Sequence, residues 1–200
     1  MKLPSKGLAL LISILLLGTA QGQDFMPDQS CLAYRAEKTM FLFKDIIVWG
    51  TSCEVNASLE KVASGWVARV SVPFATIKTD DEDRDADLKE NYFFVDKYPN
   101  LSFQSQVITK SMLLQAKKGG EWFLLGNLTV MDQVKRVKFS LTLTPKKLTG
   151  KMADGMSRLG VTPPKIAGGF FVEVHEPVEI HLDLLLSEIE GAAQALASVR

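Results

Sequence analysis

The sequence contains few of the residues that enzymes most often use for chemistry, with two histidines and two cysteines among 200 residues. Its formal charges cancel at neutral pH, and no segment carries a basic stripe or a polybasic cluster. These absences argue against a nucleic-acid partner and against electrostatic docking on anionic membranes. The sequence therefore favours a partner that is recognised through shape and apolar contact.

The two histidines, His175 and His181, fall on the polar side of their segment. A zinc site would need a third ligand from a nearby glutamate, and a nucleophile would need a cysteine on the same face. We expect solvated surface histidines, no metal site, no catalytic residue and no enzymatic activity. An enzyme that uses both histidines with a neighbouring glutamate is the weakest alternative.

One long apolar run lies at the amino terminus. Two lysines precede the run over 8–17, and small residues that suit a cleavage site follow it. The run is short for a bilayer span, so the pattern indicates a secretory signal peptide over 1–22 rather than a retained membrane helix. We predict a secreted or periplasmic protein whose mature domain covers 23–200 and has no stable membrane anchor.

The two cysteines, Cys31 and Cys53, lie early in the mature chain. In an exported protein an even pair indicates a disulfide. The bridge would join the first strand to the second or third, and closing a loop of about twenty residues contributes about 3 kcal/mol in the chain-entropy model. Two buried thiols are the alternative.

Alternating apolar and polar residues predict strands along most of the chain. The clearest case is 137–144, and a second lies at 66–74. We also expect a strand at 40–44, a bend over 45–50, and a turn at 176–177 between two late strands. About eight strands without alternating helices predict an all-β fold, either a closed antiparallel barrel or a sandwich.

Three segments depart from the strand pattern. The charged stretch 79–90 predicts a short helical crossover capped by Asp80 or Asp81; it lacks the residue order of a calcium loop. The glycine- and proline-rich stretch 145–169 predicts a long loop with one helical turn at most. The capping box formed by Ser187 and Glu190 predicts a carboxy-terminal helix over 187–199.

The stretch 72–105 resembles the signature of the YceI-like family, and the resemblance extends over roughly 30–186. The family consists of small lipocalin-like β-barrels that bind polyisoprenoids and related lipids. The residues that carry the resemblance are Ile77, Thr79, Arg84, Asp85, Leu88, either Phe93 or Phe94, Asp96, Tyr98, Pro99, Leu101, Ser102 and Phe103. Later matches are Gly126–Thr129, Val137–Lys138, Ser157–Val161, Val178–Ile180 and Leu182–Leu184.

The resemblance implies an antiparallel eight-stranded lipocalin-like barrel with an elongated cavity. Arg84, Asp85, Asp96 and Pro99 would be structural, and we expect Arg84 and Asp85 to pin the crossover through charge-assisted hydrogen bonds. Contact with a ligand head group is the alternative for Arg84 and Asp85. Strand parity and the resemblance together place nine side chains on the cavity wall: Trp66, Val70, Phe74, Phe103, Leu124, Phe139, Leu141, Phe170 and Ile180.

The resemblance also implies a function. We expect the barrel to hold the tail of an isoprenoid quinone, a polyisoprenoid or a fatty-acid-derived lipid, with the loop 150–169 as a gate and no cofactor besides the lipid. The alternative is a non-catalytic envelope stress or interaction protein whose barrel is filled by its own side chains. The sequence leaves open whether the chain forms a homodimer.

Overall fold

The computed structural model describes residues 25, 27–40, 44–162 and 172–199. Within them, ten strands form one sheet in the order β10-β3-β4-β5-β6-β7-β8-β9-β1-β2. The predicted signal peptide over 1–22, the predicted wall residue Phe170 and part of the predicted gate, 163–169, lie outside the described residues.

The strands are 2 to 14 residues long, and the α-helices are 4 to 8 residues long. The strands are β1 (Cys31–Met40), β2 (Lys44–Ser52), β3 (Asn56–Val62), β4 (Gly65–Pro73), β5 (Asn100–Ser105), β6 (Glu121–Val130), β7 (Gln133–Leu143), β8 (Lys147–Gly155), β9 (Val172–Leu185) and β10 (Ile189–Glu190). The α-helices are α1 (Glu82–Asp87), α2 (Lys110–Lys117), α3 (Met156–Leu159) and α4 (Ala192–Ala197). Short helical turns are η1 (Phe74–Thr76), η2 (Leu88–Tyr92) and η4 (Leu186–Glu188).

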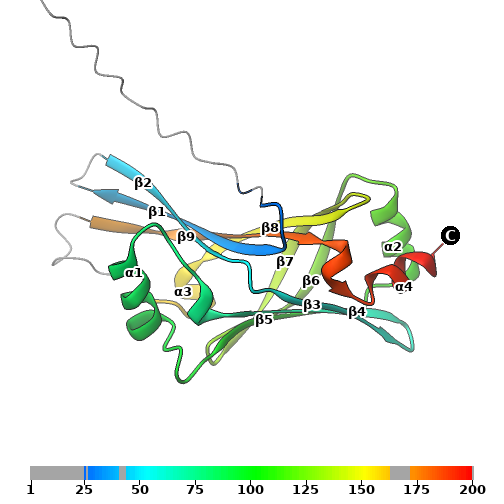
Figure 1. Cartoon of the computed structure of the whole chain (residues 1–200), viewed down its shortest axis with the longest axis horizontal. Helices are drawn as coiled ribbons and strands as arrows, with labels where there is room; N and C mark the ends of the chain where they lie inside the picture. Colours follow the sequence, from blue (N-terminus) through cyan, green and yellow to red (C-terminus); the bar gives the residue numbers. More distant parts are fainter. Residues whose placement is uncertain (1–24, 26, 41–43, 163–171, 200) are drawn as a thin grey trace, which may run out of the picture.

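The sheet curls into a half-barrel. In Figure 1, β2, β1, β9 and β8 form one layer, β3, β4 and β5 form the facing layer, and β6 and β7 connect the two. The helices α1 and α3 lie at one end of the half-barrel, and α2 and α4 lie at the other (Figure 1). The all-β prediction is confirmed, but the closed eight-stranded barrel is wrong, because the sheet has ten strands and stays open between β2 and β10.

The opening follows from the pairing of β2. Its inner edge pairs continuously with β1, from Lys44 to Ser52. On its outer edge, the described residues supply one bridge, between Thr51 and Lys78. After Lys78 the chain turns into the charged crossover instead of continuing as a strand, so the ring does not close through hydrogen bonds.

Two predicted breaks are absent. The predicted bend over 45–50 lies inside β2, where consecutive β-branched residues favour extended backbone. The predicted turn at 176–177 lies inside β9, which is continuous. The register of β1 against β9 shifts between Ala36 and Lys38, opposite this point, and such a bulge accommodates Pro177, which has no N–H to donate.

The predicted loop 145–169 also needs correction. Its first part forms β8, which pairs with β7 on one side and β9 on the other, and α3 follows at once. The segment lacks alternation partly because Gly150 faces the core without a side chain. A Cβ there would stand 2.3 Å from Leu141 Cδ2 on the adjacent strand, so the leucine occupies that space.

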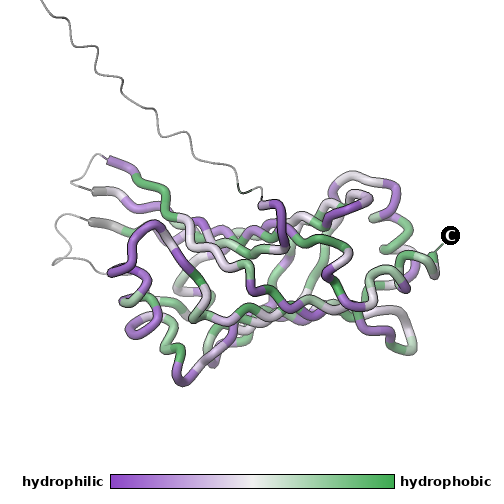
Figure 2. Tube along the Cα trace, viewed as in Figure 1, coloured by the Kyte–Doolittle hydropathy of each residue, from purple (hydrophilic) through white to green (hydrophobic). Residues whose placement is uncertain are grey.

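The carboxy-terminal helix is shorter than predicted. Ser187 lies in η4 and Glu190 in β10, which pairs in parallel with β3. The helix begins at Ala192 because Gly191 adopts a left-handed conformation, with φ of 77°, that interrupts a helix. Figure 2 shows α4 coloured hydrophobic and the crossover around α1 coloured hydrophilic.

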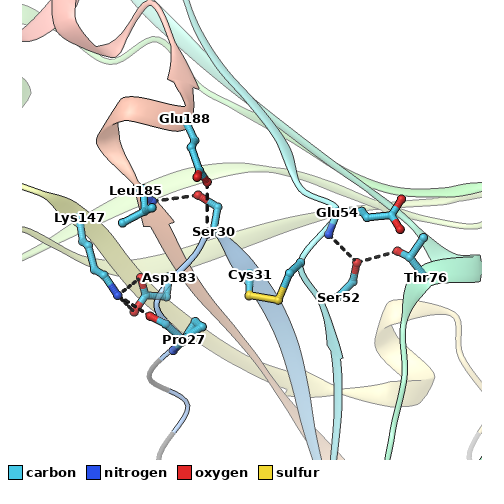
Figure 3. The surroundings of a disulfide bond; sticks show 11 residues. Pro27, Ser30, Cys31, Ser52, Glu54, Thr76, Lys147, Asp183, Leu185 and Glu188 are labelled. Carbon is cyan, nitrogen blue, oxygen red and sulfur yellow. Dashed lines mark hydrogen bonds and ion pairs between the residues drawn. A yellow bond between two sulfur atoms is a disulfide. The ribbon is translucent and has the colours of Figure 1, made fainter.

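A disulfide between Cys31 and Cys53 fastens the start of β1 to the chain just after β2. Figure 3 shows the polar contacts around it. The backbone N–H of Leu185 donates to Ser30 Oγ at 2.9 Å, and the hydroxyl oxygens of Ser52 and Thr76 are 2.6 Å apart. The bridge and these bonds tie β1, β2, β9 and η1 together. No helix in the described part of the chain has the length and apolar character to cross a bilayer.

Candidate functional site

A cavity of about 170 Å³, here the proximal cavity, lies at the end of the half-barrel that carries α1 and α3. Strands β1, β2 and β9 supply one wall, and the crossover, α3 and residues of β5 and β6 supply the others. Most of its side chains are apolar: Leu32, Tyr34, Ala36, Val48, Ile77, Leu88, Tyr92, Phe93, Leu101, Val130, Met156, Leu159, Val161, Val174, Val178 and Ile180. Four charged side chains also border it: Glu37, Lys38, Arg84 and Asp87.

The crossover is held in place by local hydrogen bonds. Asp81 caps α1 by accepting from the Arg84 backbone N–H at 2.9 Å, so the predicted short helix is confirmed. The buried Asp85 carboxylate accepts from the Thr79 backbone N–H at 2.8 Å and from its hydroxyl at 2.7 Å. Arg84 donates from Nε to Thr79 Oγ1 at 3.0 Å and also pairs with Asp80. These bonds fix the segment that covers the cavity.

Two stacked aromatic rings connect the segment before the crossover with the segment after it. Phe74 in η1 and Phe93, just after η2, have ring centroids 4.6 Å apart and planes 18° apart. The Pro99 carbonyl accepts from the Phe74 N–H at 2.9 Å, which links the end of the crossover to its beginning. Asp96 is exposed in the intervening turn. Phe93 therefore lines the proximal cavity while its ring is held in place by Phe74.

Tyr34 brings a phenolic hydroxyl to the lining of the proximal cavity. Burial raises the pKa of the Tyr34 phenol to about 12, and the neighbouring carboxylates of Asp85 and Asp80 add to the rise. The Arg84 guanidinium opposes them and lowers that pKa. The phenol thus stays protonated at physiological pH and can donate a hydrogen bond. The charged groups on the cavity lining are two acids and two bases, so they present no net charge to a ligand.

The wall supplied by α3 depends on Glu176. The backbone N–H of Ser157 donates to Glu176 Oε2 at 3.1 Å, and the Ser157 hydroxyl donates to the other oxygen. These hydrogen bonds hold the pKa of Glu176 below its usual range. The helix ends at Gly160, whose φ of 86° suits glycine. Met156 and Leu159 are thereby turned toward the cavity.

The predicted wall residues are distributed along the whole half-barrel. Ile180 lines the proximal cavity, and Phe74 supports it through Phe93. Val70, Phe103 and Phe139 border a gap of about 20 Å³ in the centre, here the middle gap. Trp66 is buried, and its backbone pairs with Ile108.

Leu124 and Leu141 lie beyond the middle gap. With Val70 and Trp122 they border a second apolar space of about 80 Å³, here the distal cavity, beneath α2 and α4. The middle of the half-barrel is filled mainly by the rings of Phe103 and Phe139, whose centroids are 5.2 Å apart in an edge-to-face contact. The structure therefore separates most of the predicted wall from the proximal cavity.

The histidines do not come together. His175 Nε2 lies 2.9 Å from Thr39 Oγ1, whereas His181 Nε2 lies 2.6 Å from Glu179 Oε2 and packs edge-on against Trp49. Within the described residues, no three His, Cys, Asp or Glu side chains converge as metal ligands.

Sequence reasoning missed several residues of the proximal cavity. Leu32, Tyr34 and Ala36 share one face of β1, and their alternation was available in the sequence. Leu88 and Phe93 belong to the motif that resembles the family signature, but we assigned them no wall role. Leu159 lies in the later match Ser157–Val161, which was given no wall role, and Met156 carried no signal, because it lies on a single helical turn.

Comparison with known proteins agrees with this architecture. The sequence profile described as the YceI-like domain matches residues 28–185. The crystal structure of Burkholderia cenocepacia BcnA is similar, with 16% identity, a TM-score of 0.56, and coverage of 76% of this chain and 95% of that chain. A polyisoprenoid-binding domain from Saccharophagus degradans, implicated in plant cell wall breakdown, is similar with 10% identity, a TM-score of 0.54, and coverage of 78% and 95%. No curated protein matches the sequence. Because the profile spans most of its length, the chain belongs to the YceI-like domain family.

Proposed function

We propose that the protein is a non-catalytic, secreted or periplasmic lipid-binding protein. It holds part of an isoprenoid quinone, a polyisoprenoid or a fatty-acid-derived lipid in the proximal cavity, and needs no other cofactor. The observation that carries the proposal is an apolar cavity of about 170 Å³ with a small number of polar groups around it. Family membership and the polyisoprenoid-binding domain that resembles this fold support it.

The size of the cavity limits what it can hold without rearrangement. Its volume is close to the roughly 150 Å³ of an engineered cavity that binds benzene. One ring or about one to two isoprene units would fit, at a gain of about 0.8 kcal/mol per buried methylene. A longer tail must leave through the mouth or displace the side chains around the middle gap.

A filled barrel without a ligand is the second candidate. The edge-to-face contact of Phe103 with Phe139 and the narrow middle gap favour it, because they show that side chains occupy the centre. It predicts that the protein acts through its surface, as an envelope stress or interaction protein.

Lipid extraction from the protein purified from its native host, followed by mass spectrometry, tests the proposal. Ala36→Phe places a ring in the proximal cavity, and Ala153→Phe makes the same change at an exposed position of β8. We expect the native protein and the Ala153 variant to carry lipid, and the Ala36 variant to remain folded by circular dichroism but to carry none. An empty native protein that also rejects quinone, polyprenyl and fatty acyl compounds would contradict the proposal.

A further inference from the structure

The Tyr34 hydroxyl is a hydrogen-bond donor on the lining of the proximal cavity. It makes no hydrogen bond to any group in the part of the chain that the structure describes, yet its oxygen is not fully buried. The indole nitrogens of Trp49 and Trp122, in contrast, are unpaired and buried without accessible surface. A polar group that loses its water and gains no partner weakens the binding of whatever displaces the water. The Tyr34 hydroxyl is therefore an unpaired donor within reach of a ligand.

The ring of Tyr34 lies on the cavity side of the sheet. Side chains two residues apart on a strand share a face, and Leu32 and Ala36, on either side of Tyr34 in β1, both line the cavity. The ring lies across Gly50 of β2, where a Cβ would stand 2.8 Å from the hydroxyl oxygen. Val48, two residues before Gly50, lines the same cavity. The hydroxyl therefore lies over the inner face of β2.

The charges near the hydroxyl favour an uncharged partner. Burial is the largest cause of the raised pKa of Tyr34, and three charged groups of the crossover are close enough to act on it as well. The Arg84 guanidinium lowers this pKa, whereas the carboxylates of Asp85 and Asp80 raise it. An anion at the hydroxyl would thus meet two carboxylates and one guanidinium, and that guanidinium already pairs with Asp80. Because burying an anion without a cation of its own is costly, the site favours a neutral oxygen.

We propose that the proximal cavity binds the carbonyl-bearing end of a neutral amphiphile, and that the Tyr34 O–H donates a hydrogen bond to the carbonyl oxygen. This inference rests on the proposed function and specifies the ligand class. A carbonyl suits the site because it accepts a hydrogen bond and carries no proton that would itself need an acceptor in an apolar space.

Two kinds of compound carry such a carbonyl: the ring of a quinone and the ester or amide of an acyl chain. The volume of about 170 Å³ holds the carbonyl together with one ring or a short segment of chain. Ionised fatty acids and isoprenoid phosphates fall outside the class, because they would bring a negative charge to the hydroxyl. The site therefore discriminates among the lipids that an apolar cavity alone would accept.

The test uses small compounds that differ at one group. Acetophenone carries a carbonyl, isopropylbenzene has nearly the same shape without it, and benzoate carries a carboxylate in its place. Each compound is titrated by calorimetry into the wild type, Tyr34→Phe and Tyr98→Phe, the last at a tyrosine outside the proximal cavity. Comparing one compound between two proteins cancels the free energy of its own hydration.

We expect Tyr34→Phe to bind acetophenone about threefold to tenfold more weakly than the wild type, as the loss of one net hydrogen bond would give. Its affinity for isopropylbenzene should be unchanged, which also shows that the cavity has kept its shape. Tyr98→Phe is the matched control and should bind both compounds as the wild type does. Benzoate should bind the wild type more weakly than acetophenone.

The infrared spectrum of bound acetophenone provides a second reading, because a hydrogen bond lowers the stretching frequency of a carbonyl. That frequency should be lower in the wild type than in Tyr34→Phe. Methyl benzoate and dimethylbenzoquinone then distinguish the two sources of the carbonyl. The compound that loses more affinity in Tyr34→Phe identifies the ligand as an acyl compound or as a quinone.

Equal affinities of the wild type and Tyr34→Phe for all the carbonyl compounds would overturn the inference and leave the proposed function intact. An equal loss for isopropylbenzene would also overturn it, since the variant would then have altered packing rather than a hydrogen bond. Benzoate that binds as tightly as acetophenone would contradict the restriction to neutral ligands. If isopropylbenzene does not bind the wild type, the proximal cavity is closed to ligands, and the proposed function fails instead.

Discussion

The ring of Tyr34 lies across Gly50, its direct partner on the neighbouring strand. A Cβ on Gly50 would stand 2.1 Å from Tyr34 Cε1 and 2.8 Å from the hydroxyl oxygen. Glycine at this position thus creates the space that allows an aromatic side chain of β1 to lie flat beside the proximal cavity. A substitution at Gly50 should therefore affect both the free energy of unfolding and the space available to a ligand.

Gly50→Ala should therefore push the Tyr34 ring toward the cavity. We expect a loss of about 1–3 kcal/mol in the free energy of unfolding from overpacking, together with weaker uptake of lipid. Ala153→Val, which adds methyl groups at an exposed position of β8, is the control. Denaturant unfolding and displacement of a fluorescent lipid measure the two effects. Equal behaviour of both variants would contradict the role assigned to Gly50.

The pKa of Tyr34 predicts a loss of stability in strong alkali. Because burial raises this pKa from 10.0 to about 12, the folded state holds the phenolic proton more tightly than the unfolded state. The resulting stabilisation is complete below pH 10 and is lost as the pH rises through about 12. We expect about 1–2 kcal/mol of stability to disappear over this window, less than the full shift implies because the side chain is half-buried.

Tyr34→Phe should remove this loss of unfolding free energy at alkaline pH. Tyr98→Phe, at a tyrosine outside the proximal cavity, should leave the loss unchanged. Denaturant unfolding at a series of alkaline pH values gives the profile, and ultraviolet absorbance of tyrosinate follows ionisation directly. Bound lipid should move the Tyr34 ionisation to still higher pH. An identical alkaline slope in the wild type and in Tyr34→Phe would show that the phenol is not buried.

The disulfide gives a prediction that depends on redox conditions. Replacing both Cys31 and Cys53 by serine should lower the free energy of unfolding by about 3 kcal/mol, because the bridge closes a loop between residues separated by 22 positions. Reductant should destabilise the wild type by a similar amount and leave the double variant unchanged. The same unfolding curve for all three samples would mean that the bridge contributes nothing.

Local chemistry explains which parts of the fold were predictable from the sequence. The crossover helix and its cap at Asp81 depend on residues within one turn, so the sequence alone was sufficient. Strand existence followed from alternation, as in β7, where alternate residues are buried. The prediction failed where a partner strand decides the conformation. β8 contains Gly150 and little alternation, and it exists because β7 and β9 pair with it on both sides.

The cavity was less predictable than the fold. Parity along a strand identifies inward side chains but does not distinguish a packed interior from an open one. Phe139 and Ile180 both face inward, yet one fills the middle gap and the other lines the proximal cavity. The difference arises from the spacing between the crossover and β1, both of which line the proximal cavity. That spacing depends on distant segments, so periodicity could not reveal it.

Phe139 provides the sharpest test of how the interior is filled. It is 3% exposed, contacts Phe103 edge to face, and borders a gap of about 20 Å³. Phe139→Ala should lower the free energy of unfolding by about 3–5 kcal/mol, because a well-packed ring leaves a void that its neighbours cannot close. Phe123→Ala, at a ring that is 51% exposed, is the matched control and should cost about 0.5 kcal/mol or less.

The same variant should change the preference for ligand length. Removing the Phe139 ring widens the middle gap between the proximal and distal cavities, so long chains should gain affinity relative to short ones, whereas Phe123→Ala should leave the ratio unchanged. Affinities for a series of alcohols of increasing length, measured by displacement, give that ratio. A cost below about 1 kcal/mol with no change in chain-length preference would mean that the middle of the half-barrel is already open, contrary to the packing described for Phe103 and Phe139.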